Sequence, residues 1–142
     1  MIEILIPGEP VAQGRPRFAR RGRSVVAFDP AKSRTWKASA QAHMVMAFPG
    51  PPMRGPLSVE VAATFACPKS QWRKREPQAA RWHEKRPDAE NVAKAVLDAA
   101  TGVLWFDDAQ VSRLLVLKVV GGQLEAPCVF LRVERITTEP SR

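Results

Sequence analysis

The chain has 142 residues, a length that suits one compact domain over residues 1–142 and leaves little room for a second. Hydrophobic residues make up 45% of it, enough for a buried core, which excludes a disordered basic tail. Lysine and arginine number 22 against 14 acidic residues, so the formal net charge is +8. Such a charge favours a polyanionic partner, most often a nucleic acid, because neutralised phosphates release counterions.

The sequence predicts no association with a membrane. No apolar run approaches the roughly 18 residues that cross a bilayer, and Met1 leads into an apolar run without the regions of a signal peptide. Cys67 and Cys128 lie far apart and match no metal-binding spacing, so we expect reduced thiols rather than a disulfide. We therefore expect a soluble protein of the cytoplasm.

The first predicted element is a strand over residues 2–6, followed by an arginine-rich segment over residues 13–24. This basic arm should be a loop or a flexible hairpin, because like charges this dense stay solvated. Its arginines, interleaved with Phe18, favour an arm that grips nucleic acid phosphates over a loop that only adds solubility. The arginines of the arm are Arg15, Arg17, Arg20, Arg21 and Arg23.

A helix is predicted next, with Asp29 as N-cap and Pro30 at the first helical position. Its apolar residues recur at helical spacing, which indicates one buried face. It should end near Phe48, where a run rich in proline and glycine cannot continue it. Residues 57–65 then alternate as a strand with one solvated face does.

Residues 68–87 form a basic loop, the least regular part of the prediction, with seven basic residues against two acidic ones for a local charge of +5. Trp72 and Trp82 interrupt the charges, and exposed rings between cations can stack on unpaired bases. The alternative is that both rings fold back onto the core. His83 has no partner at a useful spacing, so it is not expected to bind a metal. The cations expected to bind nucleic acid here are Arg73, Lys74, Arg75, Lys85 and Arg86.

A second helix is predicted over residues 88–100, with a buried face of valine and alanine and with Gly102 as C-cap. Two strands follow, over residues 111–120 and 127–136, and two glycines could join them as an antiparallel hairpin. A polar tail, residues 137–142, ends the sequence. The order of elements indicates an α/β (α+β) domain, a small mixed sheet with two main helices packed on it.

Two acidic clusters bracket the second helix: Asp88 with Glu90, and Asp107 with Asp108. Clustered carboxylates repel one another, and a divalent cation that prefers oxygen ligands, Mg²⁺ or Mn²⁺, relieves the repulsion. Such a metal can polarise a bound phosphate and lower the pKa of an attacking water. Lys94 lies four residues after Glu90, on the same side of the helix, where an ammonium can stabilise the transition state. This pattern predicts a site that cuts a phosphodiester.

Structural roles are the alternative for the same residues. Asp88 can be only the N-cap of the helix. Glu90 and Lys94 can be an ordinary surface pair, worth about 0.3–0.5 kcal/mol. Asp107 and Asp108 can be turn residues ahead of a strand. Spacing alone leaves these possibilities open.

The stretch RPDAENVAKAVLDAATGVLWFDDAQV closely resembles the signature of the RusA family of Holliday junction resolvases. That family carries a P-D-x-D-N-x-x-K-x-x-x-D-A block and then a D-D-x-Q-V block; here they run from Pro87 to Ala99 and from Asp107 to Val111. The resemblance implies a homodimeric, magnesium-dependent endodeoxyribonuclease that makes symmetric nicks in four-way DNA junctions during recombination and repair. It also implies a bacterial cytoplasm or a phage-infected cell as the setting, and no small-molecule cofactor.

The resemblance assigns roles by position. It implies three metal-binding, catalytic carboxylates: Asp88, Glu90 and Asp108. Lys94 would be the catalytic lysine. Asp107 is the less favoured member of its pair, and Asn91 and Asp98 would support the site or the helix packing.

Glu90 departs from the family pattern, which usually has aspartate at this position. The extra methylene moves the carboxylate by about one bond length, and a displacement of about 1 Å can lower a rate about 100-fold. One alternative is therefore a weak or inactive module that binds junctions or other DNA. A basic RNA-binding accessory protein, with its carboxylates on a solvated face, is another.

Overall fold

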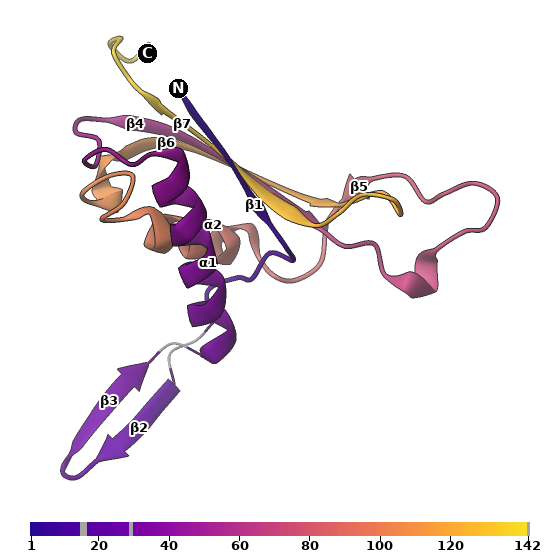
Figure 1. Ribbon diagram of the computed structural model, residues 1–142, viewed down its shortest axis with the longest axis horizontal. Coiled ribbons are helices and arrows are strands. Elements are labelled where there is room, and N and C mark those ends of the chain that lie inside the picture. The colour runs from indigo at the N-terminus through magenta and orange to yellow at the C-terminus, as the bar shows by residue number, and fades with distance from the viewer. Residues whose placement is uncertain (15–16, 29, 142) are drawn as a thin grey trace.

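The computed structural model describes residues 1–14, 17–28 and 30–141 (Figure 1). Two sequence predictions, Arg15 as a phosphate contact and Asp29 as a helix cap, lie outside the described residues. The described elements form one α+β domain, as predicted. In chain order they are β1 (Ile2–Pro7), β2 (Arg17–Arg21), β3 (Ser24–Phe28), α1 (Ala31–Ala47), β4 (Leu57–Phe65), η1 (Lys69–Gln71), β5 (Arg81–Trp82), α2 (Ala89–Ala100), η2 (Asp108–Gln110), β6 (Val111–Val120) and β7 (Cys128–Arg135).

The main sheet has five strands in the order β1-β7-β4-β6-β5. Its central strand, β4, is antiparallel to β7 and parallel to β6. The predicted β6–β7 hairpin is therefore wrong, because β4 lies between the two strands. No residue of β4 is exposed, and strands on both sides satisfy its backbone. The seven residues that join β6 to β7 are enough to cross two strand spacings, about 10 Å.

The parallel pair β4–β6 requires a crossover connection, which the basic loop and α2 supply. Both helices lie on the same side of the sheet (Figure 1). The core fills the space between them and the sheet, with Val59 and Val61 of β4 and Leu131 of β7 at 1% exposure or less. This arrangement holds α2 directly over β4 and β6.

The two helices are close to their predicted limits. α1 begins at Ala31, with Pro30 as N-cap rather than as the first helical residue, and it ends at Ala47 with Phe48 as C-cap. α2 begins after Asp88, which is its N-cap. Its C-cap is Thr101, one residue before the predicted Gly102; the glycine follows with a φ of 87°, which favours glycine. The predicted buried face of α2 is confirmed by Val92, Val96, Ala99 and Ala100.

The basic arm contains a hairpin, one of the two forms predicted for it. β2 and β3 pair in antiparallel register and project away from the sheet (Figure 1). Gly22 lies in the turn with a φ of 61°. Phe18 is 71% exposed and Val25 64% exposed, so this hairpin buries little apolar surface of its own.

The basic loop is more regular than the prediction, since it contains η1 and β5. β5 pairs with the end of β6 through Arg81↔Val120 and Trp82↔Val119. The indole of Trp82 is 72% exposed, and Trp72 is 49% exposed with its Nε1 donating to the Cys67 carbonyl at 3.1 Å. Neither ring lies in the core, which excludes the alternative that both fold back onto it.

The sheet face opposite the helices has no helix over it among the described residues. We call this surface the open face. Strand register places aliphatic and aromatic side chains there beside ion pairs. Its members are Glu3, Leu5, Glu60, Ala62, Arg113, Leu115, Leu117, Phe130, Arg132 and Glu134.

Cys67 and Cys128 are both free thiols, as predicted. Among the described residues, every helix is too short or too polar to cross a membrane.

Candidate active site

The first part of the candidate site lies on α2. Glu90 lies in its first turn, and Lys94 and Asp98 follow at intervals of four residues. Residues at this spacing project from the same side of a helix. Because the opposite side carries the buried valines and alanines, this stripe faces outward. Asp98 also approaches Lys37 of α1, with 3.9 Å between Oδ2 and Nζ.

The second part is the turn before β6, which contains adjacent aspartates. The Asp107 carboxylate accepts a hydrogen bond from the Ala109 amide at 2.9 Å, and Gln110 Oε1 accepts from the Asp107 amide at 3.0 Å. This reciprocal arrangement is a capping box. Gln110 Nε2 also donates to the carbonyls of Met53 and Gly55, at 2.9 and 3.0 Å. The turn is thus anchored, and Asp107 is occupied in holding it.

The two parts meet at one cavity of about 600 Å³. It brings together Glu90 and Lys94 from α2 with Asp108 from the turn, although Asp108 lies 18 residues after Glu90. Its full lining is Ala89, Glu90, Ala93, Lys94, Leu97, Asp98, Asp108, Leu114 and Val116. Asp88 is exposed at the start of α2 and does not line the cavity.

A family model described as endodeoxyribonuclease RusA matches residues 7–134. The chain belongs to the RusA family. It is also similar to YqaN of Bacillus subtilis (strain 168), a protein whose name describes it as uncharacterized. The two are 35% identical over 141 residues, which cover 96% of this chain and 97% of YqaN. The RusA family acts on branched DNA and is metal-dependent.

The residues of this RusA-family site fit a divalent metal. Mg²⁺ is commonly held by one or two carboxylates together with waters and substrate phosphates. Glu90 and Asp108 supply two carboxylates to one cavity. Asp88 makes no side-chain capping hydrogen bond with α2, so its carboxylate is not committed to the helix end. Among the described residues, no three histidine, cysteine or acidic side chains already form a metal cluster.

Lys118 supports the site, and sequence reasoning did not single it out. It lies on the helix side of β6, and its Nζ donates to the Lys85 carbonyl at 2.7 Å and to the Pro87 carbonyl. These bonds hold the segment immediately before Asp88 against the sheet. The one available signal was a lysine in the apolar run VSRLLVLKVV, where a half-buried charge needs partners.

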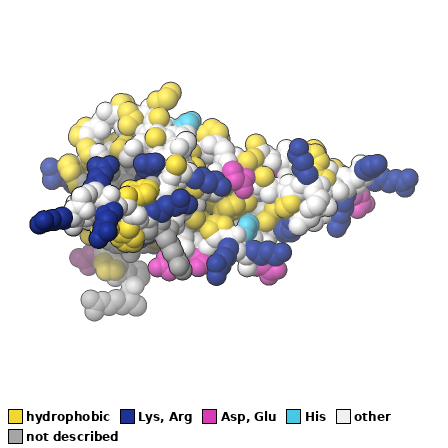
Figure 2. Space-filling view, turned by 90° about the horizontal axis from the view of Figure 1, so that it is seen from below, with side chains coloured by type: hydrophobic (Ala, Val, Ile, Leu, Met, Phe, Trp, Pro, Cys, Tyr) yellow, Lys and Arg dark blue, Asp and Glu magenta, His cyan; other side chains and the backbone are white. Residues whose placement is uncertain are grey.

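The predicted DNA-binding cations lie on two separate elements. Apart from Arg15, every one of them is exposed. The hairpin carries Arg17, Arg20, Arg21 and Arg23, and the basic loop extends from the other end of the molecule (Figure 1). Figure 2 shows lysine and arginine side chains spread along this side of the protein, with acidic and hydrophobic side chains between them.

The base of the hairpin is tied to both helices. The Gln13 amide donates to the Asn91 carbonyl of α2 at 3.1 Å, and the Gly14 amide donates to Ser33 Oγ of α1 at 3.2 Å. These hydrogen bonds hold the base of the hairpin beside α2, the helix that carries Glu90 and Lys94.

Proposed function

We propose that this chain is a Holliday junction resolvase, an endodeoxyribonuclease that uses Mg²⁺, with Mn²⁺ as an alternative metal. It would make symmetric nicks in four-way DNA junctions during recombination and repair, in a bacterial cytoplasm or a phage-infected cell. The observation that carries this proposal is the meeting of Glu90, Lys94 and Asp108 at one cavity in a RusA-family chain. Basic elements at two sides of the domain support a branched polyanion as the substrate.

In this proposal Asp88, Glu90 and Asp108 hold the metal. When bound, Mg²⁺ would lower the pKa of the attacking water and polarise the scissile phosphate. Lys94 directs its ammonium at a phosphate oxygen, where it offsets the charge that grows as the water oxygen bonds to phosphorus and the leaving oxygen departs. Leu114 and Val116 form an apolar part of the same cavity wall.

Binding of the junction is assigned to the arm and the basic loop. The arginines of the hairpin pair with phosphates of one duplex, and the loop cations pair with those of another. These contacts select a branched shape rather than a base sequence.

The active unit is proposed to be a homodimer, because two symmetric cuts require two sites related by a twofold axis. The open face supports a second copy as its occupant. Leu5 is 57% exposed there, and Leu115 and Leu117 are 40% and 36% exposed. Large exposed apolar side chains grouped on one face favour a protein partner.

Charge favours the same pairing. The open face holds three glutamates and two arginines, in a chain whose net charge is +8. Arg132 lies between Glu3 and Glu60, with nitrogen–oxygen distances of 3.3 Å to each. Two copies of a basic chain repel through most of their surface, so they approach best through the face where charges balance. That face is correspondingly poor for DNA.

The proposal is tested by incubating the protein with a labelled four-way junction and a matched linear duplex, each with Mg²⁺, Mn²⁺ or EDTA. Paired, metal-dependent nicks confined to the junction are expected. Tight junction binding without cleavage in either metal would instead favour an inactive module, with Glu90 as the cause. Glu90→Asp would then be expected to restore cleavage. Preference for single-stranded RNA over junctions would support the RNA-binding alternative.

A further inference from the structure

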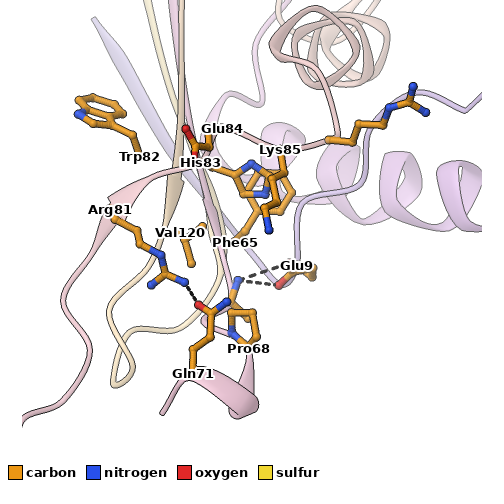
Figure 3. Close-up of a pocket in the computed structure, with 12 residues that line it drawn as sticks. Glu9, Phe65, Pro68, Gln71, Arg81, Trp82, His83, Glu84, Lys85 and Val120 are labelled. Carbon is orange, nitrogen blue, oxygen red and sulfur yellow. Dashed lines mark hydrogen bonds between the residues drawn. The ribbon is translucent and has the colours of Figure 1, made fainter. Parts of the chain in front are cut away.

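A second cavity, of about 520 Å³, lies on the helix side of the sheet beyond the ends of the helices (Figure 3). Its volume is within the range of about 300–1,000 Å³ that small-molecule sites occupy. The cavity is enclosed by the basic loop, the end of β4 and the end of β6. Its lining includes Glu9, Phe65, Arg81, His83, Lys85 and Arg86.

The lining combines two packed aromatic rings, tilted by 42° to each other, with unpaired polar atoms. The rings of Phe65 and His83 pack with their centroids 4.5 Å apart (Figure 3). Among the described residues, neither His83 Nδ1 nor Nη1 of Arg81 has a hydrogen-bond partner, although both atoms are buried. Buried polar atoms without partners are rare and point to a group that completes them. The other terminal nitrogen of Arg81 donates to Gln71.

The wall of the cavity is built rather than incidental. The Glu9 carboxylate accepts hydrogen bonds from the Ala66 amide, the shorter at 3.0 Å, which fixes the chain after β4 (Figure 3). The His83 amide donates to the Lys118 carbonyl at 3.1 Å and holds the ring over the sheet. Trp82 also lines the cavity, with its ring pointing to the opposite side of β5 from His83 (Figure 3).

The cavity lies in line with the candidate active site. Val116 of β6 lines the active-site cavity and Val120 of the same strand lines the second one. Four residues of strand separate them, about 13 Å, which is the scale of a few nucleotides along a DNA strand. Lys85 and Arg86 lie between the second cavity and Asp88, where they can bind the intervening phosphates.

We propose that the second cavity is a subsite for one unpaired nucleotide of the strand that is cut. This inference rests on the proposed function and names a subsite of the same reaction. The base packs against the rings of Phe65 and His83, and its polar edge meets His83 Nδ1 and the free nitrogen of Arg81. Because a base edge is read here, cleavage acquires a preference for one base at a set distance from the nick.

The test removes single bases from the junction and single functional groups from the cavity. A set of junctions is prepared, each of which lacks one base at a different position around the crossing point. Their binding to the Asp88→Asn variant is measured, so that cleavage does not interfere. Removal of the base that enters the cavity should weaken binding about tenfold or more at one position only, the discrimination that base-edge contacts provide. His83→Phe keeps an aromatic ring but removes its nitrogens, and Arg81→Met keeps an unbranched apolar side chain but removes the guanidinium. Each variant should bind the junction equally well with and without that base.

Lys74→Met is the matched control, since it removes a cation from the same loop outside the cavity. It should weaken binding of every junction by a similar factor and keep the sensitivity to the missing base. Equal binding of all base-deleted junctions by the chain with an intact cavity would overturn the subsite. The subsite would also be overturned if both cavity variants still bound more weakly when the same base is missing.

The outcomes separate the subsite from the proposed function. In a chain with its own Asp88, cleavage of a full set of junction sequences should show a base preference that Arg81→Met reduces about tenfold. Position-specific binding without any cleavage supports the subsite and contradicts the nuclease. Cleavage without base preference contradicts the subsite and keeps the nuclease. Failure to bind junctions overturns both.

Discussion

At the scale of single residues, adjacent aspartates in this chain have different surroundings. Asp107 caps the turn before β6 with its carboxylate on the Ala109 amide, whereas Asp108 lines the cavity that Glu90 and Lys94 also line. A capping carboxylate contributes to folding, and a cavity carboxylate is available for chemistry. Substitution of each aspartate should therefore change a different measured quantity.

Asp108→Asn is expected to lower nicking of a four-way junction about 100-fold or more, because it removes a negative ligand while keeping the shape. Asp88→Asn should behave in the same way. Junction binding, measured by gel shift in EDTA, should survive both substitutions. Near-normal nicking by either variant would remove that residue from the site.

Asp107→Ala serves as the neighbouring control. It should lower the free energy of unfolding by about 1 kcal/mol, the typical effect of losing a capping side chain. Its nicking rate at a temperature where the fold is intact should stay closer to that of the unaltered chain than the rate of Asp108→Asn. The reverse order, with Asp107 the more damaging site for cleavage, would contradict the assignment.

Lys94→Ala should lower the rate of nicking at saturating protein far more than it lowers junction affinity. The reason is that charge grows on the phosphate in the transition state, where an ammonium contributes most. Single-turnover kinetics beside a binding titration separate the two effects. A loss confined to affinity would make Lys94 a phosphate contact only.

At the scale of elements, the basic loop acts in two ways that the structure distinguishes. Its tip carries exposed cations, while its end is fastened to β6 by Lys118 through the carbonyls of Lys85 and Pro87. In the proposed function the tip affects encounter with DNA, and the fastened end affects the position of Asp88. Each function has its own test.

Reversal of the tip charges, with Arg73, Lys74 and Arg75 all changed to Glu, should weaken junction binding and reduce its salt dependence. Each lost phosphate contact lowers the slope of log affinity against log salt by about 0.9, so a change of about 2 to 3 is expected. Binding titrations between low and moderate salt give this slope. An unchanged slope would make the tip a bystander.

Lys118→Met should lower the maximal nicking rate about tenfold or more, since a misplaced catalytic group is costly. The apparent KM for the junction should change little, because Lys118 reaches backbone carbonyls rather than DNA. Lys118→Arg keeps a charged donor and should recover part of the rate. A Lys118→Met protein that is less stable but nicks at the normal rate at temperatures where it is folded would contradict a positioning role.

At the scale of the whole molecule, charge and apolar surface are separated. The cations of the hairpin and the basic loop lie on projecting elements, whereas the open face carries exposed leucines and nearly balanced charge. The proposed function uses both surfaces, one for DNA and one for a second copy of the chain. The open face is the proposed surface for the copy.

Leu117→Glu is expected to shift the protein from dimer to monomer, because it places a charge within the proposed apolar contact. Sedimentation or light scattering measures the change, and circular dichroism checks the fold. Paired nicks in one junction should become unpaired. Val45→Glu, on an α1 residue that is 51% exposed, is the control and should leave the dimer intact. A Leu117→Glu protein that remains dimeric would exclude the open face.

The sequence by itself determined the two main helices, the long strands and the family to which the chain belongs. Residues 57–65 and 111–120 were predicted as strands with the limits that β4 and β6 have, because alternation and flanking breakers are local signals. The candidate carboxylates and Lys94 were selected by their match to the family motif, because their spacing alone left structural roles open. Such features depend on neighbours within a few residues.

Only the tertiary structure decided which elements meet. The insertion of β4 between β6 and β7 depends on contacts between distant segments, and no local pattern carries that information. The different surroundings of Asp107 and Asp108 required Gln110 and its bonds to the chain near Met53. The second cavity depends on the pairing of β5 with β6, which brings His83 beside Phe65. These two residues are 18 positions apart in the sequence, so no local pattern indicates that they meet.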